Sequence, residues 1–220
     1  MNYHIDAEKI RLDEIRKRIE TTDLVPSRIS LLEEITAKFR DLESAGLTTL
    51  ADLRHELKNA KRLDALSAAT GIEKDYLILL RREIEGYFPK PAALKEFDGL
   101  QRGENEKLEK HGIRNAAEVY EATRNARNIA ALAESTSVDA STLKTLSNWA
   151  DLTRIRWVSP LTARMLADAG YDSAEKVAEA DPETLCAALE RLNEGGRYFK
   201  GKIGLRDIRR LVHAAGYAVR

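Results

Sequence analysis

The chain has 220 residues, 43 % of them hydrophobic and 33 % charged, so it is long enough to bury a substantial core and has the composition of a globular protein. Lys plus Arg and Asp plus Glu both number 36, so no overall positive charge draws the chain to a nucleic acid or a membrane, and such binding would need a local patch. A single cysteine excludes an intramolecular disulfide framework and a Cys-rich zinc site, and an aromatic content of 6 % disfavours an all-β fold.

The first residues, MNYHID, lack the basic-then-apolar pattern of a signal peptide, and no apolar run approaches membrane-spanning length. We therefore expect a cytoplasmic protein without membrane association. Leu12, Ile15 and Ile19 recur at helical spacing and predict an N-terminal amphipathic helix that ends near TTDLVP, residues 21–26.

One pattern occurs three times along the rest of the chain: a helix end, a glycine, a hydrophobe and a new amphipathic helix. The copies are DLESAGLTTLADL (residues 41–53), KLEKHGIRNAAEV (107–119) and MLADAGYDSAEKV (165–177). Gly46, Gly112 and Gly170 hold the same place and are predicted to end a helix in the left-handed conformation. The following helices are predicted to begin at the N-caps Thr48, Asn115 and Ser173.

Apolar positions of the first two copies also match at an offset of 66 residues, which chance rarely produces over so long a stretch. The matched pairs are Leu63 with Ile129, Leu66 with Leu132, Ile72 with Val138, Leu77 with Leu143 and Leu80 with Leu146. After a gap of about eight residues near residues 87–91 the register resumes at an offset of 58, with Phe97 on Ile155, Leu100 on Val158 and Leu108 on Leu166.

Since no strand-like alternation persists anywhere, the sequence predicts an all-α fold of three tandem helix-hairpin-helix-like repeats behind an N-terminal helix. The predicted segments are residues 1–29 (N-terminal helix and linker), 30–93, 94–151 and 152–220 (three repeat units, the last with a basic C-terminal helix). Two prolines, with Gly86 just before the segment, make residues 87–93 the best candidate for a domain boundary or, as we prefer, a rigid elbow.

A hairpin of this kind binds DNA through main-chain N–H groups, which glycines let approach a phosphate, without reading base sequence. In LTRIRWVSPLTARMLADAGY (residues 152–171) the packing residues remain, and Ser159-Pro160 is a sound helix start. Trp157 stands where the first glycine belongs and should obstruct a phosphate, although Arg154, Arg156 and Arg164 are near enough to contact a backbone. Structural packing and nucleic-acid contact both stay open for this copy.

The other two hairpins are acidic, so both are expected to be structural. The copy in residues 97–108 keeps Gly99 but adds Asp98, Glu104 and Glu106, and the copy near residues 31–36 has no hairpin glycine.

The C-terminal stretch KGKIGLRDIRRLVH (residues 200–213) is the best binding candidate, because a glycine-bounded aliphatic turn opens onto a basic helix. A phosphate over Ile203-Gly204 would meet N–H donors, a helix dipole and several cations, while the alternative is a solvated helix face after a glycine loop. The predicted nucleic-acid-binding residues are Lys200, Gly201, Lys202, Ile203, Gly204, Arg206, Arg209 and Arg210, assisted by Arg154 and Arg156.

Motifs for chemistry are missing: there is neither a phosphate-binding P-loop nor a dinucleotide-binding glycine fingerprint after a strand. The four histidines lack partners at ligand spacing, Cys186 sits in an apolar run typical of a buried inert thiol, and Arg81-Arg82-Glu83 is typical of a solvated helix face. We therefore expect no enzyme, metal, cofactor or small-molecule substrate.

With these residues, the chain resembles a bacterial family of uncharacterised proteins built from degenerate helix-hairpin-helix repeats. The resemblance extends over nearly the whole chain, and the matching stretches are IETTDLVPS (19–27), residues 42–53, ATGI (69–72) with its following helix, DLTRI (151–155) and residues 163–180. Better-known hairpins of this type, in DNA ligases, repair nucleases and RNA polymerase α-subunit tails, bind DNA without base specificity. The resemblance implies a non-enzymatic module that binds the DNA backbone; the alternative is a protein-interaction scaffold that uses an apolar face of the array or docks through the N-terminal helix.

Overall fold

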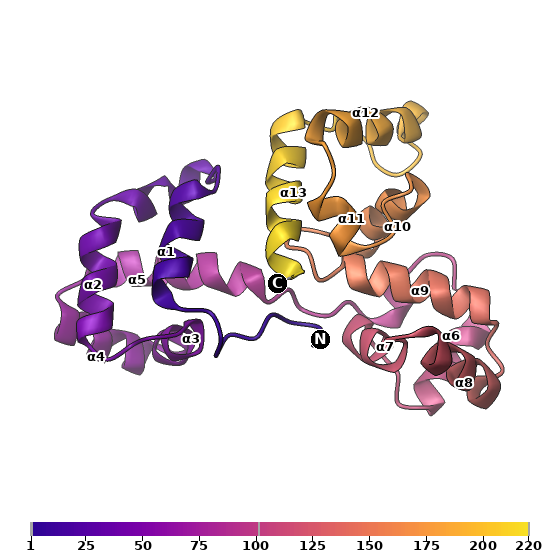
Figure 1. The fold of residues 1–220 in the computed structure, drawn as a ribbon, viewed down its shortest axis with the longest axis horizontal. Coiled ribbons are helices and arrows are strands. Elements are labelled where there is room, and N and C mark those ends of the chain that lie inside the picture. Colours follow the sequence, from indigo (N-terminus) through magenta and orange to yellow (C-terminus); the bar gives the residue numbers. More distant parts are fainter. Residues whose placement is uncertain (1, 101, 220) are drawn as a thin grey trace. The chain divides into compact units, whose positions relative to one another are not determined.

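The computed structural model describes residues 2–100 and 102–219. This part of the chain is helical and holds no β-strand, only two isolated bridges, so the predicted all-α class is confirmed (Figure 1). The chain forms two compact units: a smaller unit, Asp6–Tyr87, and a larger unit, Phe88–Arg220 together with Met1–Ile5. Each has its own buried residues and is described by itself.

The smaller unit incorporates the predicted N-terminal helix into its core. Leu12, Ile15 and Ile19 are buried as predicted, and α1 packs on α2 and η1. The helix is therefore a structural part of this unit. The elements are α1 (Leu12–Thr21), η1 (Pro26–Leu32), α2 (Ile35–Ser44), α3 (Leu50–Leu57), α4 (Ala60–Thr70), α5 (Lys74–Ile84) and η2 (Glu85–Tyr87).

The larger unit holds the remaining helices around one hydrophobic core. They are η3 (Leu94–Glu96), α6 (Arg102–Lys110), α7 (Ala116–Ala122), α8 (Ala126–Thr136), α9 (Ala140–Leu152), α10 (Pro160–Asp168), α11 (Ala174–Ala178), α12 (Pro182–Leu192), η4 (Glu194–Gly196) and α13 (Leu205–Ala218). In Figure 1, α13 runs beside α11 and the start of α12, and it contacts both.

Helices of the smaller unit recur in the larger one at a constant spacing. The starts of α3 and α7 (Leu50, Ala116), α4 and α8 (Ala60, Ala126), and α5 and α9 (Lys74, Ala140) each differ by 66 residues. A short antiparallel bridge also precedes each set, between Arg11 and Thr49 and between Ala93 and Asn115. The sequence offset thus corresponds to a repeated arrangement of helices.

The three predicted glycines take the left-handed conformation at their helix ends, with φ of 90° for Gly46, 80° for Gly112 and 91° for Gly170. Asn115 and Ser173 cap the next helices as predicted. In the first copy the cap is Thr49 instead of Thr48: the Thr49 Oγ1 accepts from the Asp52 N–H at 3.2 Å, and the Asp52 carboxylate accepts from both threonine N–H groups. These bonds lower the pKa of Asp52 to about 2.

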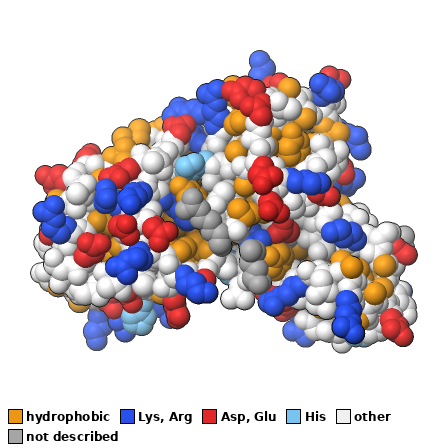
Figure 2. All heavy atoms as spheres, viewed as in Figure 1, with side chains coloured by type: hydrophobic (Ala, Val, Ile, Leu, Met, Phe, Trp, Pro, Cys, Tyr) orange, Lys and Arg blue, Asp and Glu red, His pale blue; other side chains and the backbone are white. Residues whose placement is uncertain are grey.

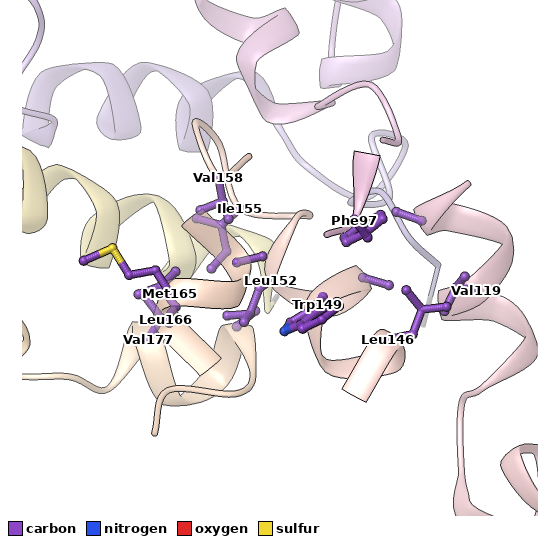
Figure 3. Packing of buried hydrophobic residues seen from close by; sticks show 14 of the residues in the cluster. Phe97, Val119, Leu146, Trp149, Leu152, Ile155, Val158, Met165, Leu166 and Val177 are labelled. Atoms are coloured by element: carbon purple, nitrogen blue, oxygen red, sulfur yellow. The ribbon is translucent and has the colours of Figure 1, made fainter. Parts of the chain in front are cut away.

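The core of the larger unit runs without interruption across the predicted boundary between residues 151 and 152. Figure 3 shows Phe97, Leu146 and Trp149 on one side, with Leu152, Ile155, Met165 and Val177 continuing the same apolar interior. The Phe97 and Trp149 rings stack in parallel, 6.1 Å apart. Residues 94–151 and 152–220 therefore share one core and are not separate units, because apolar side chains from both segments fill it.

Cys186 is buried, as predicted, and burial raises the pKa of its thiol, with further contributions from Glu190 and Glu183. The side chains that the structure describes include no group of three or more potential metal ligands. In the same part of the chain, each helix is too short or too polar to cross a lipid bilayer.

Candidate nucleic-acid interface

The hairpin between α9 and α10 is held by the residues that the sequence assigned to packing. Leu152, Ile155, Val158, Ala163 and Leu166 are all buried. The Val158 N–H donates to the Ile155 carbonyl at 3.1 Å and closes the turn. Ser159 caps α10, since its Oγ accepts from the Thr162 N–H at 3.1 Å, and Pro160 occupies the first helical position. The predicted helix start is confirmed.

Trp157 keeps the backbone conformation of the glycine it replaces. Its φ is 70°, and Gly99, the residue at the same place in the preceding hairpin, has a φ of 114°. The Trp157 side chain is 52 % exposed, and the Arg156 guanidinium lies over its ring, 4.4 Å from the centroid. That this ring obstructs a phosphate at the hairpin backbone stays a prediction.

Arg154 does not face solvent, so the prediction that it contacts a nucleic acid is wrong. Its residue exposure is 6 %. Nε donates to the Tyr3 carbonyl at 2.9 Å, Nη1 to Asp151 Oδ1 at 2.5 Å, and Nη2 to the Ala218 carbonyl. The guanidinium also lies 4.6 Å from the centre of the Tyr120 ring. This arginine joins the N-terminal peptide, α9 and the end of α13.

The hairpin before α6 carries carboxylates, in keeping with the structural role expected of it. Asp98 and Glu106 are exposed, and Glu104 accepts a hydrogen bond from Thr142 at 3.4 Å. Gly99 lies against Trp149: the position that a Cβ would take there is 3.3 Å from the Trp149 ring. This glycine therefore serves close packing of the core.

The C-terminal glycine loop is fixed at its base by one buried amide. Asn193 Oδ1 accepts from the N–H groups of Tyr198 and Phe199 at 3.0 and 3.2 Å, and its Nδ2 donates to the Phe199 carbonyl at 3.1 Å. Beyond this anchor, Gly201 has a φ of 141°. Lys200 and Lys202 on either side of it are exposed, and neither forms an ion pair with any described residue.

The start of α13 already has a carboxylate beside it. Gly204 is the N-cap and offers no side-chain cap, while Asp207 Oδ2 lies 3.3 Å from the position that a Cβ on Gly204 would take. A negative group in the first turn of a helix is stabilised there, and it repels a second anion. Asp207 thus competes for the place where the sequence predicted a phosphate.

Most of the predicted cations of α13 are engaged within the chain. Arg209 pairs with Glu183 of α12 at 2.5 Å, and Arg210 pairs with Asp207 at 3.3 Å. Arg206 is exposed but is not without a partner either. Of the predicted set, Lys200 and Lys202 are the cations that the structure leaves most available to a phosphate. Gly201 lies between them, and Ile203 and Gly204 connect Lys202 to α13. On the face drawn in Figure 2, basic side chains are interspersed with acidic ones.

The described residues form an all-helical protein in which the starts of three successive helices recur at a spacing of 66 residues. The chain belongs to the family described as "Domain of unknown function (DUF4332)", whose family model matches residues 98–217. The matched residues lie within the larger unit and include the α9–α10 hairpin and nearly all of α13. A comparison with curated proteins found no match, and neither did one with solved structures.

Proposed function

We propose that this protein is a non-enzymatic module that binds the nucleic-acid backbone without base specificity, through the loop of residues 200–204. The observation that carries the proposal is the pair Lys200 and Lys202: both are exposed, and neither is paired within the described residues. They flank a glycine in a conformation open to few other residues and lead into a 14-residue helix with a glycine N-cap. Two cations beside main-chain donors suit a phosphate.

The interpretation of the family as bacterial and derived from helix-hairpin-helix repeats stays a prediction that favours this function. A protein-interaction scaffold is the second candidate, favoured by Ile29 and Leu32, two large apolar side chains exposed on the same 3-10 helix of the smaller unit.

Reversing both lysines, as Lys200→Glu with Lys202→Glu, should abolish binding of a labelled 20-base-pair duplex. With about two phosphate contacts, the wild-type affinity should fall roughly tenfold when salt rises from about 50 to 200 mM. Fluorescence anisotropy at the two salt concentrations measures both effects. The matched control, Lys95→Glu with Lys110→Glu, changes the net charge equally on exposed sites and should bind as the wild type does. Equal loss in both double variants, or no duplex binding by the wild type, would refute the proposal.

Removing the competing carboxylate, as Asp207→Asn, should strengthen duplex binding about fivefold at low salt. One unit charge at about 4 Å in water contributes on the order of 1 kcal/mol, and salt screens it. The gain should therefore shrink as salt rises in the same anisotropy titration. An unchanged affinity at low salt would mean that phosphate does not approach the start of α13.

A further inference from the structure

Trp157 occupies a backbone conformation that its own side chain disfavours. For a bulky residue a φ of 70° is a true outlier that costs of order 1–3 kcal/mol. The residue is nevertheless only half-buried, with 52 % of its surface exposed. A glycine at this position would avoid the strain, as Gly99 does in the preceding hairpin. The exposed part of the ring contributes nothing to packing, so it is open to contact with a ligand.

The ring belongs to a surface with a definite pattern, which we call the Trp157 face: Arg156, Trp157, Leu161 and Arg164. The Arg156 guanidinium lies 4.4 Å from the centroid of the indole, and Trp157 is 52 % exposed. Leu161, 37 % exposed, and Arg164 are three residues apart on α10 and so share a side of this helix, whose N-cap Ser159 follows Trp157 by two residues. The hairpin and the first turns of α10 thus carry an exposed aromatic ring, an exposed aliphatic side chain and two arginines.

The basic character continues from this face into the C-terminal glycine loop. Asp168 at the end of α10 receives a hydrogen bond from the Tyr198 hydroxyl at 2.5 Å and lies 3.8 Å from Arg164 Nε. The Arg197 guanidinium is 5.4 Å from the centre of the Tyr198 ring. Tyr198 therefore attaches the loop that carries Lys200 and Lys202 to the exposed side of α10. Arg164 and Arg197 both lie close to this contact between Tyr198 and Asp168.

We propose that the Trp157 face binds an unpaired base of a single-stranded nucleic acid, with the base stacked on the indole. Arg156 and Arg164 are then placed at the flanking phosphates. Stacking on an aromatic ring needs no particular base, but it does need a base that is free of its duplex neighbours. The helix α10 spans about 14 Å, a distance of roughly two nucleotides of an extended strand. The positive flanks favour a polyanion over an apolar protein surface.

This inference deepens the proposed function and rests on it: the loop of residues 200–204 holds backbone phosphates, and the Trp157 face selects strands with exposed bases. The chain holds two tryptophans, and the other one, Trp149, is buried. Quenching of the exposed indole by a stacked base therefore reports on Trp157 directly.

The test uses the full chain and a twelve-residue oligothymidine, with anisotropy of an end label for affinity and tryptophan emission for stacking. Trp157→Ala should weaken binding about tenfold. Trp157→Phe should retain most of the affinity while losing the emission change. Ile29→Ala, at an exposed apolar residue of the smaller unit, is the matched control and should bind as the wild type does. Far-UV circular dichroism before titration checks that each variant is folded.

The outcomes separate the two proposals. Oligothymidine binding that is insensitive to Trp157→Ala, or that leaves the wild-type emission unchanged, overturns the Trp157 face while salt-dependent duplex binding still supports the loop. Failure of the wild type to bind either nucleic acid overturns both. A protein captured only when Trp157 is present, without oligonucleotide binding, also overturns the inference and makes the face a protein contact.

Discussion

Arg154→Ala should destabilise the larger unit by about 3–5 kcal/mol, a substantial part of the stability of a domain of this size. The substitution removes the donors for the Tyr3 and Ala218 carbonyls and leaves Asp151 without its cation. Asp151 Oδ2 also accepts from the Ala174 N–H at 2.7 Å, so the start of α11 loses a fixed partner as well. Buried polar groups left unsatisfied cost more than the bonds themselves contribute.

Tryptophan emission during urea unfolding measures this effect, because Trp149 and Trp157 both lie in the larger unit. The midpoint should fall strongly for Arg154→Ala. The midpoint of Arg154→Lys should lie between those of the wild type and Arg154→Ala, since an ammonium keeps the charge but cannot reach several acceptors at once. Arg127→Ala, at an exposed arginine of α8, should change the free energy of unfolding by less than about 0.5 kcal/mol. A wild-type midpoint for Arg154→Ala would show that the buried arginine is dispensable.

Arg154 also shows why the candidate site could not be predicted fully from the sequence. An arginine between Thr153 and Ile155 in a hairpin has the composition of a phosphate contact, and nothing local distinguishes it from Arg156. Its partners come from residues 3, 120 and 218, so its burial is a product of the tertiary fold. Helical periodicity, in contrast, is a local property, and the predicted helices and buried apolar positions are accordingly found.

The basic C-terminal segment could be recognised in the sequence as a cluster of charges. The sequence did not show which of these cations are paired within the chain. Arg209 is paired with Glu183, which is 26 residues away in the sequence and on another helix. Asp207 could have been noticed, because an acidic residue in the first turn of a helix is a common capping choice. In the sequence, Trp157 was noticed only as a residue that stands in the place of a hairpin glycine. Its left-handed backbone and the Arg156 stack are visible only in three dimensions.

The two compact units do not follow the four predicted repeat segments, for a related reason. Tyr3 of the first segment is buried in the core of the larger unit and bonds to Thr153 Oγ1 at 3.1 Å. The remainder of that segment, α1, belongs to the smaller unit. Repeats indicate where similar helices occur, whereas the units are defined by which apolar faces cover one another. That pairing depends on contacts between distant residues.

Glu83→Ala should destabilise the smaller unit by about 3–5 kcal/mol, although the sequence placed Glu83 on a solvated helix face, which is wrong. The residue is 2 % exposed, and its Oε2 lies 3.6 Å from Nε of Arg28, whose side chain is itself largely buried. Arg18 on α1 is buried as well, with its guanidinium 4.4 Å from the centre of the Tyr87 ring. Deleting the carboxylate leaves buried positive charge without its counter-ion.

Because the two tryptophans lie outside the smaller unit, the effect is best measured by hydrogen exchange of peptides from residues 6–87, resolved by mass spectrometry. Protection in α1 and α5 should fall by about two orders of magnitude or more if exchange follows unfolding of the unit. The double variant Arg28→Leu with Glu83→Leu should lose less than Glu83→Ala, since an apolar pair removes both buried charges together. If the double variant is the less stable of the two, the pair contributes a net attraction beyond mutual neutralisation. If Glu83→Ala leaves exchange unchanged, the carboxylate is not needed to hold α5 against η1.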